Sequence, residues 1–260
     1  MPALVLKLTL APALVAAATI AARRLGHRAG GTVAGLPVVA APIVFIYAIE
    51  RGDAYAAGAA GSGTLGLVSL VLFCVAYAAC ARRAGYVAAL AAGWLAFGIA
   101  TAALSAVHLP LTVAALLALA AISGGAWLLA RMARPTPGTP TVGDLLPWRL
   151  AITAALVIAL TAAARGLSPH LAGLLAPFPI ITAVLAGFTH ARVGAEPAIE
   201  LLGGLVRSLV CFLAFLVVLA ATLGDLGRAG GFAFATVVTL AVWVALAAID
   251  RRVAPAAAAG

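Results

Sequence analysis

Long apolar segments, separated by short polar breaks, run through the whole sequence and constrain its fold more than any other feature. The segments cover about residues 3–22, 33–50, 61–81, 85–105, 110–130, 147–165, 171–189, 198–222 and 230–249. A helix of about 20 apolar residues is long enough to cross the hydrocarbon core of a lipid bilayer. The sequence therefore predicts an all-α, polytopic transmembrane helix bundle of about nine spans.

The fourth and fifth segments need a separate argument, because only His108, Leu109 and Pro110 divide them. One helix over 85–130 would measure about 69 Å at a rise of 1.5 Å per residue, more than twice the thickness of the bilayer core. Proline also disrupts the helix that precedes it. We therefore expect two helices that turn at Pro110.

Composition excludes a water-soluble particle. Charged residues make up 9% of the chain, whereas a soluble protein carries about 25%. The net charge of +9 comes mostly from Arg clusters between the apolar segments, where they act as topology signals. With nine spans, eleven of the sixteen Lys and Arg residues fall on one side and three on the other. This bias predicts an N-terminus outside and a C-terminus inside. The partners expected are membrane lipids, and no nucleic acid is expected to bind.

The two halves of the sequence resemble each other when small gaps are allowed. The matches are Lys7 and Arg23 with Arg149 and Arg165, Ala34-Gly35-Leu36 with Ala172-Gly173-Leu174, Pro37 and Pro42 with Pro177 and Pro179, Gly66-Leu-Val-Ser69 with Gly204-Leu-Val-Arg207, and Trp94 with Trp243. These matches predict a first four-helix repeat over 1–105, a linking helix and linker over 106–146, and a second repeat over 147–260. The alternative is that any two spans rich in Ala, Leu and Gly look alike.

A single unpaired span between two even units makes the second unit enter the membrane from the opposite side. The repeats would then be inverted, an architecture that recurs in secondary transporters with substrate sites near the midplane at interrupted helices. This step from fold to function is an analogy.

The segment Ala172-Gly-Leu-Leu-Ala-Pro-Phe-Pro-Ile-Ile-Thr-Ala183 resembles the GlpM family of small bacterial membrane proteins. The family's early lysine is matched by Arg149, its Phe-Pro element by Phe178-Pro179, and its glutamate before the third span by Glu196 or Glu200. The first half is similar to a diverged copy, with Lys7, Ala34-Gly-Leu-Pro37 and Pro42 but no Phe-Pro. The resemblance implies a duplicated GlpM-like protein of the bacterial cytoplasmic membrane with a role in transport, and it names no substrate.

Arg207 is the sharpest candidate for a substrate-binding residue, because it lies ten residues inside an apolar span. An ionisable side chain at that depth is costly and is by default a functional hypothesis. Glu200 lies two turns away on the same face, and Glu196 one turn further. This Glu-Glu-Arg stripe would guide an anion or a proton. The alternative is a structural Arg207 that pairs with Glu200 or extends toward the membrane surface.

Further candidate residues lie inside the spans and at their ends. Four prolines, Pro37, Pro42, Pro177 and Pro179, predict two interrupted helices at a site to which Pro42 and Pro179 belong, or kinks that serve packing alone. Ser69 and Thr182 are polar positions in apolar spans, as ligands or as contacts between helices. A gate or entrance, or alternatively a set of solvated turns, is predicted at Glu50, Arg51, Asp53 and His190.

Motifs for catalysis are absent from the sequence, so neither an enzyme nor a cofactor is expected. The three cysteines lie inside apolar segments, and the four histidines fall on loops of both sides, so no metal site is expected either. The function predicted is a secondary transporter or permease for a small substrate, anionic or lipid-linked. The alternative is a non-transporting scaffold or accessory subunit of an envelope process, and an intramembrane enzyme ranks third.

Overall fold

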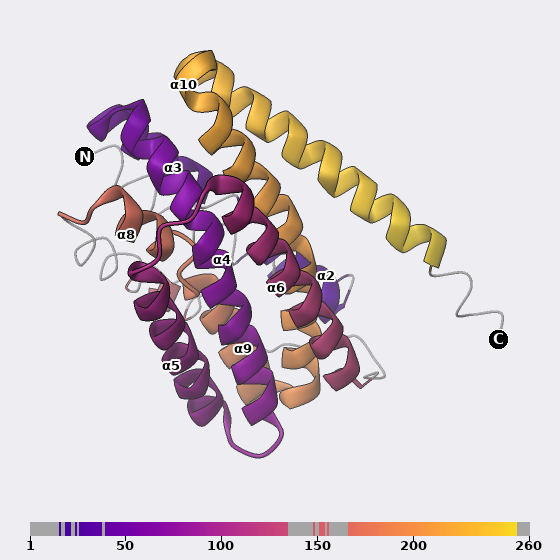
Figure 1. Cartoon of the computed structure of the whole chain (residues 1–260). Coiled ribbons are helices and arrows are strands. Elements are labelled where there is room, and N and C mark those ends of the chain that lie inside the picture. Colours follow the sequence, from indigo (N-terminus) through magenta and orange to yellow (C-terminus); the bar gives the residue numbers. More distant parts are fainter. Residues whose placement is uncertain are drawn as a thin grey trace.

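The computed structural model describes residues 26–37, 40–134 and 166–253, together with residues 16, 19–21, 24, 148, 151–153 and 155. All regular structure in this part of the chain is helical. The helices, shown in Figure 1, are α2 (His27–Ala34), α3 (Ala40–Arg51), α4 (Asp53–Ala81), α5 (Tyr86–Ser105), α6 (Leu111–Met132), α8 (Pro169–Leu175), α9 (Ile180–Arg192) and α10 (Ala195–Val253). Most of the predicted spans 3–22 and 147–165 lies outside the described residues.

Among the described residues, five helical stretches are long and apolar enough to cross a membrane. They are α4, α5, α6, the pair α8–α9, and α10. The prediction of a helical membrane protein is therefore confirmed. The division of 85–130 is confirmed as well, because α5 ends at Ser105 and Pro110 is the N-cap of α6.

Helix α10 has 59 residues, which would extend about 88 Å if straight and so far exceeds the bilayer core. Gly227 breaks it, with φ 64° and ψ 178°, a conformation open to glycine almost alone. The chain turns back there, and residues 228–253, which we call the C-terminal arm, lead away from the bundle (Figure 1). Phe232 and Ala235, near the start of this arm, still pack against the core. The central part of α10, residues 195–226, stays inside the bundle.

The core of the bundle is an antiparallel pair formed by α4 and the central part of α10. Gly61 lies against Ala220, and Gly63 lies against Leu216. Each end of the pair is joined by an ion pair between an acid at the start of one helix and an arginine after the end of the other. These ion pairs are Asp53–Arg228 and Arg82–Glu196. We call the end where α4, α6 and α9 finish the arginine end, and the opposite end the histidine end.

Two segments of the described chain are interrupted helices. The first consists of α2 and α3, and the second of α8 and α9. Prolines cause the breaks, because they lack the N–H that a continuous helix needs: Pro37 lies in the first break, and Pro177 and Pro179 lie in the second. The two helix breaks therefore occur near the predicted prolines, whereas the prediction that they face each other at a site stays a prediction. Pro42 is not at a break, since it is the third residue of α3, where proline is tolerated.

Each first half-helix packs closely against the central helix of the other half through glycine. A Cβ atom at Gly31 of α2 would overlap the carbonyl oxygen of Leu201 in α10. A Cβ atom at Gly173 of α8 would overlap the carbonyl oxygen of Ala59 in α4. Gly31 and Gly173 are 142 positions apart, and so are Ala59 and Leu201.

The same interval of 142 positions relates several other contacts. Gly35 lies against Ser208, and Pro177 lies against Gly66. Phe45 and Phe232 stack edge to face, and Gly187 lies against Leu90. The junction glycines Gly52 and Gly194, and Gly85 and Gly227, also follow this interval. These contacts therefore match at one constant interval, without a gap. The motif comparison had instead paired Gly66 with Gly204, whereas the contacts make Ser208, one helical turn further on, the equivalent of Gly66.

Candidate functional site

A cavity of about 610 Å³ lies at the arginine end between α2, α6 and α10; we call it the arginine cavity. Glu200, Gly203 and Arg207 form its wall on α10, because residues spaced by three and four share one face of a helix. The remaining lining residues are Arg28 of α2, Ala126, Trp127, Leu129 and Ala130 of α6, and Ala133 and Arg134 just after it. The structure thus brings Arg207 and Glu200 to one cavity.

Positive charge dominates the arginine cavity. Three arginines, each from a different part of the chain, line it together with one carboxylate, that of Glu200. The pKa of Glu196 is lowered mainly by its hydrogen bonds from Arg82, and Arg134 also lies close enough to lower it. Arg28 and Arg134 are exposed, whereas Arg207 and Glu200 are half-buried. Focused positive charge in a cleft with low-dielectric walls attracts anions. The cavity therefore has the electrostatics of an anion site, with an apolar wall supplied by α6.

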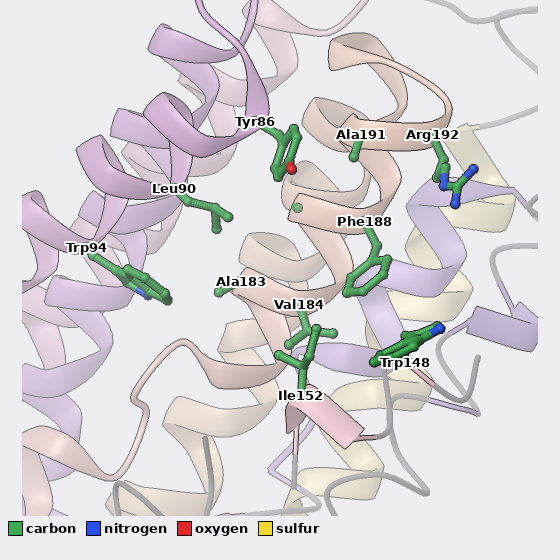
Figure 2. A pocket seen from close by; sticks show the side chains of 11 residues that line it. Tyr86, Leu90, Trp94, Trp148, Ile152, Ala183, Val184, Phe188, Ala191 and Arg192 are labelled. Atoms are coloured by element: carbon green, nitrogen blue, oxygen red, sulfur yellow. The ribbon is translucent and has the colours of Figure 1, made fainter. Parts of the chain in front are cut away.

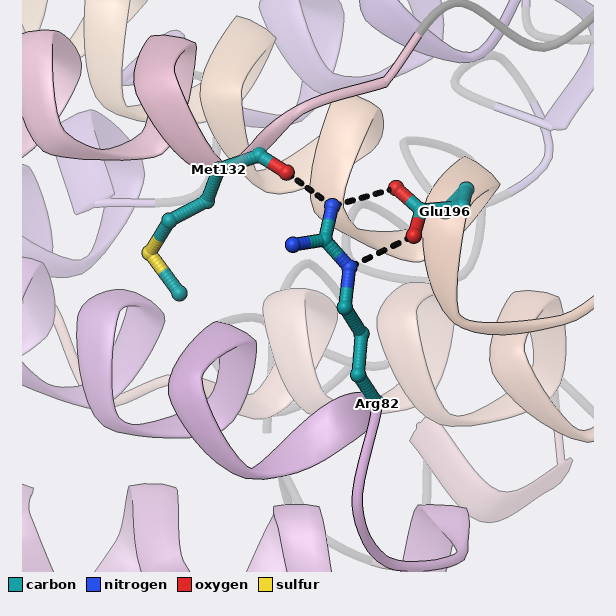
Figure 3. A network of polar contacts seen from close by, with 3 residues as sticks. All are labelled: Arg82, Met132 and Glu196. Atoms are coloured by element: carbon teal, nitrogen blue, oxygen red, sulfur yellow. Dashed lines mark hydrogen bonds and ion pairs between the residues drawn. The ribbon is translucent and has the colours of Figure 1, made fainter.

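Glu196, the third member of the predicted stripe, lies outside this cavity in an ion pair. Arg82 donates from Nε to Oε1 at 2.6 Å and from Nη2 to Oε2 at 2.7 Å (Figure 3). The same guanidinium donates to the carbonyl oxygen of Met132, the last residue of α6. The hydrogen bond to Glu196 raises the pKa of Arg82 above its usual value. Glu196 therefore joins α4, α6 and α10 at the arginine end.

A second cavity, of about 360 Å³, lies at the histidine end between α4, α8 and the start of α6; we call it the histidine cavity. Ser62 Oγ lies 3.0 Å from His170 Nδ1, and the His108 and His170 rings stack at 4.4 Å between centroids. His170 Nε2 is buried and has no hydrogen-bond partner among the described residues. This cluster was not predicted from the sequence. The only signal for it is that the predicted topology places His108 and His170 on the same side of the membrane.

The two cavities occupy equivalent places at opposite ends of the bundle. Glu200, Gly203 and Arg207 line the first, and Gly58, Gly61 and Leu65, each 142 positions earlier, line the second. Arg28 of the first corresponds in the same way to His170 of the second. Helix α6 supplies its last turns to one cavity and its first turns to the other.

A third cavity, of about 470 Å³, lies between α5, α9 and residues 148 and 152, and its wall is mostly apolar. Leu90 and Trp94 line one side, and Phe188 and Trp148 line the other (Figure 2). Arg192 is its one charged lining residue. The positions equivalent to Leu90 and Gly187 are Phe232 and Phe45, whose rings pack against each other edge to face.

The predicted polar positions inside the spans are buried. Ser69 has no exposed surface, and its Oγ has no hydrogen-bond partner among the described residues. Thr182 is 4% exposed. Pro179 is the N-cap of α9 and so closes the second helix break. None of these three residues lines any of the three cavities above.

The predicted entrance residues mostly join elements to one another. Arg51 Nη1 donates to the Leu167 carbonyl oxygen at 3.2 Å, and Asp53 pairs with Arg228 at 2.9 Å. Both contacts lie at the histidine end, where Glu50 is exposed. His190 Nδ1 lies 3.1 Å from the Tyr77 hydroxyl, between α9 and α4. At three of the four positions the structure therefore shows a tertiary contact.

Comparisons with protein-family models, curated proteins and solved structures find no match to this chain. The resemblance to the GlpM family therefore stays a prediction. Within the described part of the chain, no three His, Cys, Asp or Glu side chains gather as a metal ion would require. The site must be interpreted from its own geometry, in which the arginine cavity is the strongest feature.

Proposed function

We propose that this protein is a secondary transporter, a permease that moves a small anionic or lipid-linked substrate across the membrane. One observation carries the proposal. Two interrupted helices pack on two antiparallel central helices through contacts that recur at an interval of 142 positions, and equivalent cavities lie at opposite ends of the bundle. Interrupted helices in inverted repeats are the usual framework of substrate sites in secondary transporters.

The proposal includes two inverted four-helix repeats joined by α6. The packing supports this arrangement. Helix α2 packs along α10 and α8 packs along α4 at equivalent positions. Because α4 and α10 are antiparallel, the two packed pairs point in opposite directions. Alternating access in such folds is a rocking of one repeat against the other around a fixed site. Opening one end would require the ion pair there to part: Arg82–Glu196 at the arginine end or Asp53–Arg228 at the histidine end.

The proposed topology has nine spans in a bacterial cytoplasmic membrane, with the N-terminus outside and the C-terminus inside. The distribution of described arginines supports it, because cytoplasmic loops carry an excess of positive charge. Those at the arginine end include Arg28, Arg82, Arg83, Arg131, Arg134 and Arg192, whereas Arg51 and Arg228 lie at the histidine end. Tags on residues 1 and 260 should report from opposite compartments, and tags in the same compartment would contradict the inverted arrangement.

Transport itself is tested in proteoliposomes that contain the full chain. We expect uptake of an oxyanion or an anionic lipid that falls when Arg207 is replaced by Ala, because Arg207 is the deepest cation of the arginine cavity. Arg192→Ala is the matched control, since Arg192 lines a different cavity. A failure of the wild-type protein to move any member of a broad panel of anions and lipids would contradict the proposal.

A second candidate is a non-transporting scaffold that holds a membrane partner. Its docking surface would be the C-terminal arm, which exposes Phe234, Val237, Leu240 and Val244, a face that lipid covers where no partner is bound. The two functions differ in whether the interior opens. In a variant with Cys74, Cys80 and Cys211 replaced by Ala, a transporter should allow a membrane-impermeant thiol reagent to reach Ser69→Cys or Thr182→Cys, both buried here. A scaffold should leave both unlabelled, with Leu109→Cys as the accessible control.

A further inference from the structure

We infer that the arginine cavity binds a phosphate monoester. The inference rests on the proposed transport function only for the statement that this ligand is what moves. The binding site itself stands on the lining residues, their charges and the shape of the cavity.

The charge of the cavity matches this ligand. Arg28, Arg134 and Arg207 against Glu200 give a net charge of +2 from the lining residues. A phosphate monoester carries about −1.5 to −2 at neutral pH, whereas a carboxylate carries about −1. A monoester therefore balances the cavity more closely than a carboxylate does.

The type of cation also matches. All three cations are arginines, whose planar guanidinium presents paired N–H donors that fit phosphate oxygens in a bidentate manner. They come from α2, from the second residue after α6 and from α10, so a phosphate group would be approached from three directions. Glu200 limits the total positive charge, and we expect it to disfavour ligands that carry more than one phosphate.

The size of the cavity requires more than a phosphate group. Its volume of about 610 Å³ falls in the range of about 300–1,000 Å³ that holds whole organic ligands. Ala126, Leu129 and Ala130 provide an apolar wall, and Trp127, exposed on α6, stacks under Arg131 at 3.9 Å. The phosphate would meet the arginines while its organic part lies along α6.

The position of the cavity fits two sources of the same chemistry. Arg207 lies eleven residues from Glu196 at the helix start, about 16 Å along α10, so the site extends from the end of the bundle into its interior. A lipid phosphate monoester would enter along the exposed α6, and a water-soluble one would enter from the end of the bundle. Both require the same three arginines.

Binding is tested on the full chain in nanodiscs of neutral phosphatidylcholine, with radiolabelled dihexanoyl phosphatidic acid and glycerol phosphate as probes. We expect saturable binding that weakens about tenfold in Arg207→Gln and in Arg28→Gln, because each removes a charge-assisted contact. Binding should tighten severalfold in Glu200→Gln, which removes the opposing charge. Arg192→Gln, in the apolar cavity, should leave binding unchanged.

The opposite sign expected for Glu200→Gln separates recognition from misfolding, since a damaged fold would weaken binding in every variant. Binding of phosphatidic acid alone supports a lipid ligand, binding of glycerol phosphate alone supports a soluble one, and either result supports the site. No binding of either probe, or binding insensitive to Arg28 and Arg207, would overturn it. Wild-type binding without flux would refute transport but leave the binding site standing. Flux that is insensitive to Arg207→Gln would refute the binding site but leave transport standing.

Discussion

The arginine cavity and the histidine cavity occupy equivalent places, yet their chemistry differs. Both lie where a half-helix crosses a central helix beside one end of α6. Glu200 and Arg207 face one, whereas Gly58 and Leu65, 142 positions earlier, face the other. The close backbone contacts of Gly31 and Gly173 are the same in both. The packing of the crossing is thus common to the two halves, while the residues that face the ligand space have diverged.

The two halves also differ in how their last helix packs. Helix α5 lies on the bundle, and Phe73 packs against Gly93. The C-terminal arm, its counterpart at the interval of 142, packs on the bundle near its start, where Phe232 meets Phe45, and then leads away (Figure 1). Four sets of substitutions, two of them at equivalent positions, test how far the two halves share one plan.

The largest effect is expected at the two glycine crossings. Gly31→Ala and Gly173→Ala should each destabilise the protein by about 3 kcal/mol, because a methyl group would force two backbones apart. Thermal unfolding in detergent measures the loss. Gly124→Ala, on α6 with open space around it, should be neutral or stabilising. Tolerance of Ala at one crossing but not the other would break the comparison between the halves.

Gly227 and Gly85 form the next test, since they are equivalent junctions with different backbones. Gly227 has φ 64° and Gly85 has φ −65°, and neither has an atom within 4 Å of a built Cβ. Gly227→Ala should cost about 2 kcal/mol of conformational strain, and Gly85→Ala should cost little. The same thermal measurement checks both, and equal losses would show that the turn does not depend on the conformation of Gly227.

The two ion pairs at the ends of the core should differ in strength. Arg82→Gln should cost about 1.5 kcal/mol, because Arg82 makes charged hydrogen bonds to Glu196 and to the Met132 carbonyl. Arg228→Gln should cost about 0.5 kcal/mol, since the Arg228–Asp53 pair is single and more exposed. Unfolding at low and high salt distinguishes them, and we expect the Asp53 pair to be the more sensitive to salt.

The last test concerns the histidine cavity, where the expected effect is smaller than that of Arg82→Gln. Ser62→Ala and His170→Phe should each cost about 1 kcal/mol by removing the Ser62–His170 hydrogen bond. His170→Phe retains a ring that stacks on His108. In a double-mutant cycle the two losses should not add, and additive losses would show that the hydrogen bond contributes nothing.

The sequence by itself determined the features that depend on local periodicity. The length and apolar character of the segments predicted membrane helices, and prolines predicted the two breaks. Helical spacing placed Glu200 and Arg207 on one face, and both line the arginine cavity. These properties follow from 3.6 residues per turn and from the missing N–H of proline, so they need no knowledge of neighbouring segments.

Only the tertiary structure decided which distant residues meet. Glu196 pairs with Arg82, 114 positions away, and His170 stacks on His108, although spacing had placed Glu196 with Glu200 and had left the histidines scattered. The sequence matches left the interval open, since the pairs Lys7–Arg149 and Arg23–Arg165 are 142 apart whereas Ala34–Ala172 and Gly66–Gly204 are 138 apart. The backbone contacts at glycines decided for 142. Such contacts depend on how two helix surfaces fit when they cross, and a sequence rich in Ala, Leu and Gly offers many surfaces of nearly equal fit.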